Sequence, residues 1–286
     1  MTNIGIIGIG CIGSSLARDV KTLNLGEVYL CDRNTDYLSR AQELDLGHNY
    51  FRNVKDLAQE SDIIIVSVPV IYIADVILEA SKYAKEGAII TDVGSVKCSI
   101  IERVEDQLPR HVTYIPGHPI TAYTVGNGPD AGRDRAFDGK VYALTPLEDT
   151  PLEALEVLSN ILQQIGANIA IMEPERHDIC LGFTSHLPHL IAFSMMNSSA
   201  KLTSQLHEDV TKYAGGSFQD LTRVAGSDAQ MWQGIFSENK DNLIELCDLF
   251  MSELSTLREM VKTEDQKGLE EFIKQARNVR LKAFNN

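Results

Sequence analysis

The stretch IGIIGIGCIGSSLARDV, residues 4–20, carries the pattern on which the predicted fold rests. An apolar run leads into Gly8, Gly10 and Gly13, spaced G-x-G-x-x-G, and a helical pattern follows them. In a strand–turn–helix unit the first glycine allows a tight turn, the second lets the backbone approach a pyrophosphate, and the third lets helix and strand pack closely. The stretch therefore predicts a dinucleotide-binding turn, and the glycines of an ordinary tight turn are the alternative.

The end of the second apolar run favours NAD as the dinucleotide. Asp32 ends that run in VYLCDRN, where a carboxylate suits a ribose 2′-hydroxyl and repels the 2′-phosphate of NADP. Arg33 offsets part of that repulsion. The helix N-terminus offers amides to the phosphates, and the strand that ends in SVP lies on the same edge. The candidate cofactor-binding residues are Gly8, Gly10, Cys11, Ile12, Gly13, Asp32, Arg33, Ser67 and Pro69.

Composition and charge narrow the class of protein. The 286 residues are 44% hydrophobic and 23% charged, which is ordinary for a soluble globular protein. The 26 basic and 40 acidic residues give a net charge of −14, and no Lys/Arg block occurs. We therefore expect no nucleic-acid partner and no anionic membrane partner, since both require a basic surface. An anionic substrate would need a few specific basic residues.

Cysteine usage and the N-terminal sequence predict a cytoplasmic protein. The five cysteines are scattered and form no CxxC pair, so a disulfide framework or a zinc ribbon is not expected. The start MTNIGIIGIGC has no charged region before its apolar residues, unlike a signal peptide. No apolar run approaches the roughly 20 residues that a membrane span needs.

Short apolar runs alternate with helical patterns in the first part of the chain. Most runs are continuous, such as DIIIVSV and GAIITD, as expected of strands covered on both faces. This alternation predicts an α/β fold with a doubly wound, mostly parallel sheet. The predicted strands are 3–8, 27–31, 62–68, 87–92, 112–115, 141–145 and 167–172, with helices at 72–84 and 152–165 among those between them.

Only helical patterns follow residue 172. We therefore predict two domains, a dinucleotide-binding domain at 1–173 and an all-α domain at 174–286. The last two predicted helices, 240–262 and 264–283, repeat apolar residues at helical spacing. The helical part is short for the apolar surface it carries, so we predict that a second copy covers it in a homodimer.

Two polar residues near strand ends are candidates for chemistry. Ser95 follows a strand end in TDVGSVK, on the sheet edge where ligands bind in this architecture. A helix N-cap is the alternative role for Ser95. His118 follows the strand 112–115 and opens the glycine-rich stretch 117–132, which predicts a loop. A turn residue that caps the backbone is the alternative for His118.

The helical part offers three more candidates. His186 and His189 lie three residues apart in SHLPH, so they share one side of a helical turn that Pro188 kinks or breaks. No third ligand stands at a recognisable spacing, so we predict no metal site, and packing histidines are the alternative. Arg223 suits a carboxylate ligand, or pairs with Asp220 at the surface.

The combination GIGCIGSSLA, TDVGSVK, GHP…GPDAG, SHLPHLIAF and DLTRVAGSDAQMW resembles the prephenate/arogenate dehydrogenase family over nearly the whole chain. The resemblance implies a Rossmann domain followed by a helical dimerisation domain. It also implies NAD(P)-dependent oxidative decarboxylation of prephenate or arogenate, giving 4-hydroxyphenylpyruvate or tyrosine in tyrosine biosynthesis.

The resemblance assigns roles to the candidates residue by residue. His118 matches the histidine that accepts the proton of the ring hydroxyl, and Ser95 matches a serine that hydrogen-bonds near that hydroxyl. Arg223 matches the arginine that binds the substrate carboxylate. His189 matches a histidine of the substrate pocket, and His186 is its neighbour.

One departure from the family pattern concerns the loop after His118. The family usually continues HP-x-A-G-T/S-E, whereas this chain reads HPITAYTVGNGPDAG, so the choice between prephenate and arogenate stays open. Two rival functions also remain. One is a β-hydroxyacid or imine dehydrogenase with a similar pair of domains, and the other is a non-catalytic NAD-binding regulatory module.

Overall fold

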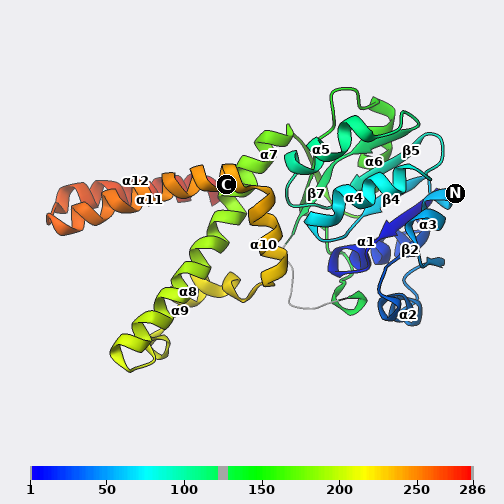
Figure 1. Cartoon of the computed structure of the whole chain (residues 1–286). Coiled ribbons are helices and arrows are strands. Elements are labelled where there is room, and N and C mark those ends of the chain that lie inside the picture. Colours follow the sequence, from blue (N-terminus) through cyan, green and yellow to red (C-terminus); the bar gives the residue numbers. More distant parts are fainter. Residues whose placement is uncertain (1, 122–127, 285–286) are drawn as a thin grey trace. The chain divides into compact units, whose positions relative to one another are not determined.

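The computed structural model describes residues 2–121 and 128–284 (Figure 1). The chain divides into two compact units, one that runs to Asn239 and one that begins at Lys240. Each unit is described by itself.

The first unit is built on a parallel sheet of six strands in the order β3-β2-β1-β4-β5-β6. The chain leaves β1 toward β2 on one side and continues with β4 on the other, so the order reverses at β1 and β4. In open sheets of this kind, ligands bind at the carboxyl ends of the strands at that reversal. The strands are β1 Asn3–Ile7, β2 Glu27–Cys31, β3 Asn49–Phe51, β4 Ile63–Val66, β5 Ala88–Asp92 and β6 Val112–Ile115.

Helices cover both faces of this sheet. Buried residues of α1 and α6 join one core cluster, and those of α3, α4 and α5 join the other. The central strands β4 and β5 are buried at every position, which explains their continuous apolar sequences. The helices are α1 Cys11–Thr22, α2 Thr35–Glu43, α3 Val54–Glu60, α4 Val70–Ser81, α5 Cys98–Val104 and α6 Leu152–Gln164.

A second sheet of three strands corrects the expectation of one mostly parallel sheet. It contains β7 Gly117–Ile120, β8 Val141–Leu144 and β9 Asn168–Ile171, and β7 runs antiparallel to β8. The prediction of a loop over 117–132 is wrong for its first four residues. Pro119 lowered the strand signal there, but β7 is an edge strand that pairs on one side, where a residue without an N–H is tolerated.

Helices α7 to α10 belong to the same compact unit as the sheets. The helical run 174–206 contains a π-helical segment, Gly182–His186, followed directly by α8. Pro188 lies in the first turn of α8, directly after the π-helical segment, and has no N–H to donate to the helical turn before it. The bounds are α7 Pro174–Leu181, α8 Leu187–Leu206, α9 Gly216–Thr222 and α10 Ala229–Glu238, with 3₁₀ turns at Glu105–Gln107, Pro129–Ala131, Val210–Tyr213 and Arg223–Gly226.

The run Pro174–Leu206 is long and apolar enough, by length and composition alone, to cross a membrane. Its mean hydropathy is 1.3, and the expectation of no such run missed it. Core helices of soluble proteins pass the same test, and this run carries the buried polar residues His177, Asp178 and His186. The absence of a membrane partner therefore stays a prediction.

The second unit consists of α11 Lys240–Lys262 and α12 Gln266–Phe284, which pack against each other. Their bounds lie close to the predicted ranges 240–262 and 264–283. Leu243 is the one buried residue among the described residues of these helices. Several large apolar side chains are more than half exposed, including Ile244, Leu249, Met251, Leu254, Val261, Ile273 and Val279.

Candidate active site

The three glycines of the turn are of two kinds. Gly8 has a φ of 95°, and a Cβ there would lie 2.2 Å from the carbonyl oxygen of Ser67. A Cβ on Gly13 would lie 2.0 Å from the carbonyl oxygen of Gly8. The chain's own packing thus requires both residues. Gly10 is different, because its φ of −80° suits any residue and no atom of the described residues lies within 4 Å of a Cβ placed there.

An ordinary tight turn accounts for Gly8 and Gly13 but not for Gly10. The open space at Gly10 fits a group that approaches the backbone from outside, as a pyrophosphate does. Gly10 is also the N-cap of α1, and the first turn of that helix contains no acidic residue. The first amides of α1, those of Cys11, Ile12 and Gly13, have no helical partner and are available to bind an anion at this end.

The Asp32 carboxylate braces the same turn. One oxygen accepts from the amide of Ile9 at 2.7 Å, and the other accepts from the amide of Asn34 at 2.8 Å. Each oxygen keeps a second lone pair, so the half-buried carboxylate can still accept from ribose hydroxyls. The Arg33 guanidinium lies over the Tyr72 ring, 5.4 Å from its centre.

The predicted cofactor residues gather at the carboxyl ends of β1, β2 and β4. The amide of Ser67 donates to the carbonyl of Ile7 at 2.7 Å, which ties the end of β4 to the end of β1. Pro69 is the N-cap of α4. These residues fit a bound dinucleotide. The space at Gly10, the free amides of the first turn of α1 and the Asp32 carboxylate lie at the edge of the sheet where the strand order reverses.

His118 lies in β7 and belongs to a chain of three polar side chains. Its Nδ1 is 2.9 Å from Nε2 of His177, and Nδ1 of His177 is 2.8 Å from Oδ1 of Asp178. His118 is 7% exposed, and the other two are buried in α7. His177 and Asp178 were not predicted from the sequence, although a buried His-Asp pair interrupts the apolar pattern of that helix.

Burial keeps His118 and His177 neutral. It lowers the pKa of His118 well below 6.5, and the positive charge of Lys97 and the neighbouring His177 act in the same direction. Burial also lowers the pKa of His177, although its bond to Asp178 opposes that shift. For Asp178 the balance is reversed, because burial raises its pKa but hydrogen bonds from His177 and two amides bring it below 3.8.

Asp178 also caps α5, one of the helices that cover the first sheet. Its carboxylate accepts from the amide of Lys97 at 2.8 Å and from the amide of Cys98 at 2.9 Å, where α5 begins. The alternative role of Ser95, an N-cap of this helix, is therefore filled by Asp178. Ser95 itself is half-buried beyond the end of β5, and no hydrogen bond of its hydroxyl is found among the described residues.

Lys97 ties the start of β7 to β5. Its side chain is completely buried, and Nζ donates to Oδ1 of Asp92 at 2.5 Å and to the carbonyl of Gly117 at 2.6 Å. The other carboxylate oxygen of Asp92 accepts from the Tyr114 hydroxyl at 2.8 Å. A buried ion pair thus holds the residue before His118, and the sequence did not predict this pair.

His189 stacks on the indole of Trp232, with ring centres 3.6 Å apart. Its Nδ1 donates to the carbonyl of Ser185 at 2.8 Å, which leaves Nε2 as an acceptor. The positive charge of Arg223, after the larger effect of burial, lowers the pKa of His189, so Arg223 lies near this ring. Arg223 is exposed, and the described residues include no ion-pair partner for it, Asp220 included.

His186 presents a buried donor with no partner. The Asn239 amide nitrogen donates to the carbonyl of Asp178 at 2.9 Å and lies 3.1 Å from Nδ1 of His186. Nδ1 therefore accepts, and the proton of a neutral ring is on Nε2, which has no hydrogen-bond partner among residues 2–121 and 128–284. The indole Nε1 of Trp232 is also buried and has no partner within the same residues. The two rings are neighbours, with centres 6.0 Å apart, and their two donors fit a polar ligand.

Neighbouring side chains connect all three predicted substrate residues to His118 in one row. His186 lies close enough to His118 to affect its pKa, and Trp232 connects His186 to His189. Arg223 follows at the exposed end. The unusual loop after His118 cannot be placed in this row, because 122–127 lie outside the described residues.

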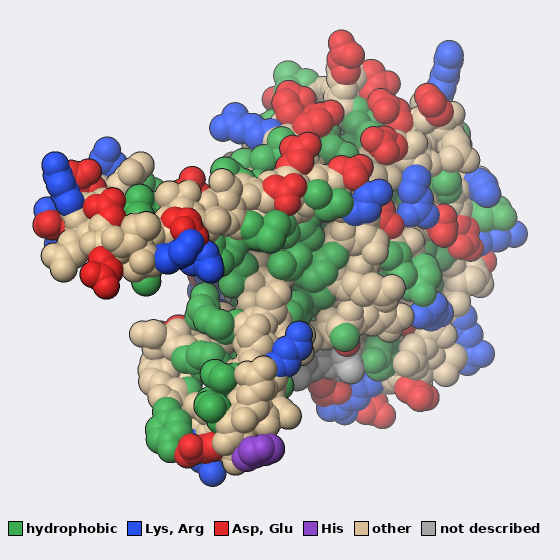
Figure 2. All heavy atoms as spheres, turned by 60° about the vertical axis from the view of Figure 1, so that its left-hand side comes forward, with side chains coloured by type: hydrophobic (Ala, Val, Ile, Leu, Met, Phe, Trp, Pro, Cys, Tyr) green, Lys and Arg blue, Asp and Glu red, His purple; other side chains and the backbone are tan. Residues whose placement is uncertain are grey.

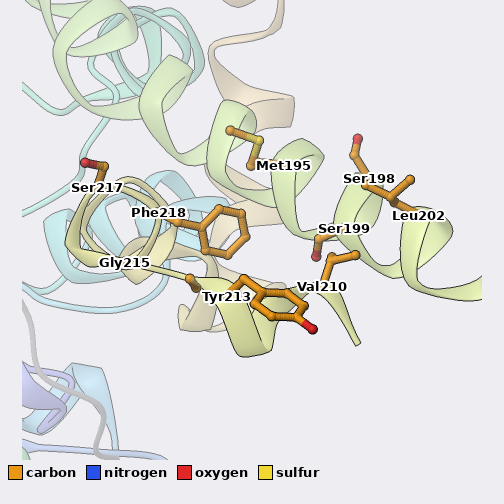
Figure 3. A pocket seen from close by; sticks show the side chains of 10 residues that line it. Met195, Ser198, Ser199, Leu202, Val210, Tyr213, Gly215, Ser217 and Phe218 are labelled. Atoms are coloured by element: carbon orange, nitrogen blue, oxygen red, sulfur yellow. The ribbon is translucent and has the colours of Figure 1, made fainter. Parts of the chain in front are cut away.

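A separate cavity of about 550 Å³ lies between α8, the 3₁₀ turn Val210–Tyr213 and α9. Figure 3 shows the rings of Tyr213 and Phe218 and the side chain of Met195 around it. None of the predicted site residues lines it.

On the face drawn in Figure 2, Lys and Arg side chains are interspersed with Asp and Glu.

Comparisons with known proteins agree over both parts of the chain. The model of the prephenate dehydrogenase nucleotide-binding domain matches 16–171, and that of the prephenate dehydrogenase dimerization domain matches 173–275. A cyclohexadienyl dehydrogenase of Zymomonas mobilis is 37% identical over 98% of this chain and 95% of its own length. The prephenate dehydrogenase of Bacillus subtilis is 30% identical over 96% of this chain and 74% of its own.

A solved structure supports the same assignment. The prephenate dehydrogenase of Aquifex aeolicus, in complex with hydroxyphenyl propionate and NAD⁺, superposes with a TM-score of 0.91 at 31% identity. The match covers 99% of this chain and 98% of that one. With its glycine turn, its buried histidine chain and these similarities along its whole length, the chain belongs to the prephenate dehydrogenase family.

Proposed function

We propose that this chain catalyses the NAD-dependent oxidative decarboxylation of prephenate, arogenate or both, giving 4-hydroxyphenylpyruvate or tyrosine. Membership of the family and the fit of the glycine turn to a dinucleotide support the reaction class. The observation that carries the proposal is His118, a buried and neutral histidine whose Nδ1 is already hydrogen-bonded. Such a ring can accept a proton at Nε2.

The roles of the residues follow from their chemistry. When bound, NAD⁺ supplies the acceptor for the hydride that leaves the substrate ring. His118 accepts the proton of the ring hydroxyl, and Ser95 hydrogen-bonds near that hydroxyl. Loss of the ring carboxylate as carbon dioxide then makes the ring aromatic, so the reaction is effectively irreversible.

Arg223 binds a substrate carboxylate. The chain has a net charge of −14, so its overall field repels an anion, and recognition needs a placed cation. A planar guanidinium with no ion-pair partner among the described residues suits a carboxylate with two parallel hydrogen bonds. His189 and the unpartnered Nε2 of His186 offer an acceptor and a donor to the same ligand.

We propose that the functional division of the chain lies at 173, with a cofactor domain at 1–173 and a substrate and dimerisation domain at 174–286. Packing divides the chain elsewhere, after Asn239, because α10 packs on α4 and α7 reaches the sheet edge. A homodimer is supported by the family's dimerization domain and by the exposed apolar side chains of α11 and α12. We expect the protein to act in the cytoplasm.

The function is tested by the near-ultraviolet absorbance of NADH. The purified protein is incubated with NAD⁺ and, in turn, prephenate, arogenate and a 3-hydroxy acid. We expect NADH with prephenate, arogenate or both, and its loss in His118→Asn. NADH with the 3-hydroxy acid alone would indicate a β-hydroxyacid dehydrogenase. No NADH with any of the three, despite measurable NAD⁺ binding, would favour a non-catalytic module.

A further inference from the structure

The chain of side chains behind His118 begins at a carboxylate whose orientation is fixed. Asp178 accepts from the amide of Lys97 at Oδ1 and from the amide of Cys98 at Oδ2. Both amides open α5, so the carboxylate cannot rotate without losing two hydrogen bonds. Oδ1 therefore faces Nδ1 of His177 at 2.8 Å in one defined direction.

The hydrogen-bond donor and acceptor are fixed at each step from Asp178 to His118. An ionised carboxylate only accepts, so Nδ1 of His177 carries the proton that it donates to Asp178. The Nε2 of a neutral His177 then has a lone pair, and it lies 2.9 Å from Nδ1 of His118. Two lone pairs facing each other at that distance repel. Nδ1 of His118 must therefore carry a proton, and its Nε2 keeps the lone pair.

A doubly protonated His177 would reverse this order, and its surroundings oppose that state. The groups that face it or His118 are Asp178, Asp92, His186 and Lys97. Burial and the Lys97 charge lower the pKa of His177, and its net shift is downward despite both carboxylates. His177 is thus neutral near physiological pH.

We infer that His177 is a positioning residue that fixes the tautomer of His118, so that the lone pair of the base is on Nε2. The inference deepens the proposed function and rests on it, because it concerns the base which that reaction requires. Neither His177 nor Asp178 needs to touch the substrate. Their effect is to exclude the form of His118 whose Nε2 is already protonated.

The tautomer can be read directly by nitrogen NMR on protein with ¹⁵N-labelled histidine. The chain has seven histidines, and the signals of His118 are those that disappear in His118→Asn. Near neutral pH we expect a protonated Nδ1 and an unprotonated Nε2 in the wild-type protein. A wild-type His118 with its proton on Nε2 would overturn the inference, whatever the enzyme's activity.

A matched pair of variants measures the effect on turnover. His177→Gln keeps an amide oxygen that can accept from Nδ1 of His118, whereas His177→Leu removes every acceptor. We expect kcat to fall by about 10²-fold or more in His177→Leu, within the range that a positioned acid–base group contributes. His177→Gln should recover most of kcat. KM should change little in both variants, because His177 is completely buried.

A double variant separates positioning from general damage. In a His118→Asn background the base is absent, so His177→Leu should lower kcat by less than about threefold further, since residues that act as a unit are not additive. A full additional loss in the double variant, or a wild-type kcat in His177→Leu, would refute the inference. If the wild-type tautomer is as stated but neither prephenate nor arogenate is turned over, the proposed function fails instead.

Discussion

The glycine turn gives the sharpest prediction, because substitutions of two glycines three residues apart should have different effects. A change at Gly10 should weaken cofactor binding without lowering stability, whereas a change at Gly13 should lower stability. Gly10→Ala places a methyl group more than 4 Å from every atom in the described part of the chain, at a φ of −80° that alanine adopts freely. The protein without cofactor should therefore unfold at the wild-type temperature or slightly above it, since a compatible Gly→Ala change stabilises by about 0.4–1 kcal/mol. Gly13→Ala places its methyl 2.0 Å from a backbone oxygen.

The expected magnitudes follow from those distances. Overpacking costs about 1–3 kcal/mol, and about 1 kcal/mol lowers Tm by roughly 2–4 °C in a protein of this size class. Gly13→Ala should thus lower Tm by several degrees. In Gly10→Ala a similar cost falls on the complex alone, because the methyl fills the space for the pyrophosphate. The Kd for NAD⁺ should rise by about 5- to 150-fold.

Thermal unfolding without cofactor and calorimetric titration with NAD⁺ measure the two effects. Gly215→Ala is the matched control, since its Cβ also meets nothing within 4 Å but lies at the start of α9. It should leave the affinity for NAD⁺ unchanged. Wild-type affinity in Gly10→Ala would refute the assignment of the cofactor site to this turn. A Tm loss in Gly10→Ala equal to that in Gly13→Ala would refute the distinction between the two glycines.

Three further variants test the remaining assignments. The wild-type protein should prefer NAD⁺ over NADP⁺, and Asp32→Ser should narrow the ratio of the two kcat/KM values; a native preference for NADP⁺ would contradict this reading. Arg223→Ala should raise KM for the substrate by an amount equivalent to about 2–5 kcal/mol with little change in NAD⁺ affinity, and equal losses for both would indicate a structural role. His118→Asn should lower kcat by about 10²–10⁴-fold with a much smaller change in KM. Because a base must be unprotonated and burial lowers the pKa of His118, wild-type kcat should fall only below pH 6.5, and a variant that keeps this acid limb would exclude His118 as the base.

The first sheet was predictable because its signals are local. Five of the seven predicted runs contain strands of this sheet, whose central strands are covered on both faces and have continuous apolar sequences, and the other two runs contain β8 and β9 of the second sheet. The two strands that were missed lack that signal. β3 is a three-residue edge strand without a buried position, and β7 consists of Gly-His-Pro-Ile. A strand held by its partner rather than by its own composition cannot be recognised from a local window.

The candidate site could be proposed from the sequence only where a single residue type suggests the chemistry. The glycine spacing, the acidic end of β2 and a histidine that follows β6 can each be recognised in the sequence by themselves. The hydrogen bonds that connect His118 to His177 and Asp178 cannot be recognised in the sequence. His118 and His177 are 59 residues apart and become neighbours only when β7 and α7 meet. A polar pair such as His177 and Asp178 on a buried helix face is the signal that could have raised the question.

The order of groups behind His118 resolves a conflict between two requirements of a base. A carboxylate in direct contact with His118 would fix its tautomer, but it would also favour the charged ring and raise its pKa. With His177 between them, the carboxylate of Asp178 is one ring further away, and its Coulomb effect weakens with that distance. The hydrogen-bond direction is transmitted through the intervening ring, whereas most of the charge effect is not. In our inference, His118 therefore stays neutral while its lone pair is held on Nε2.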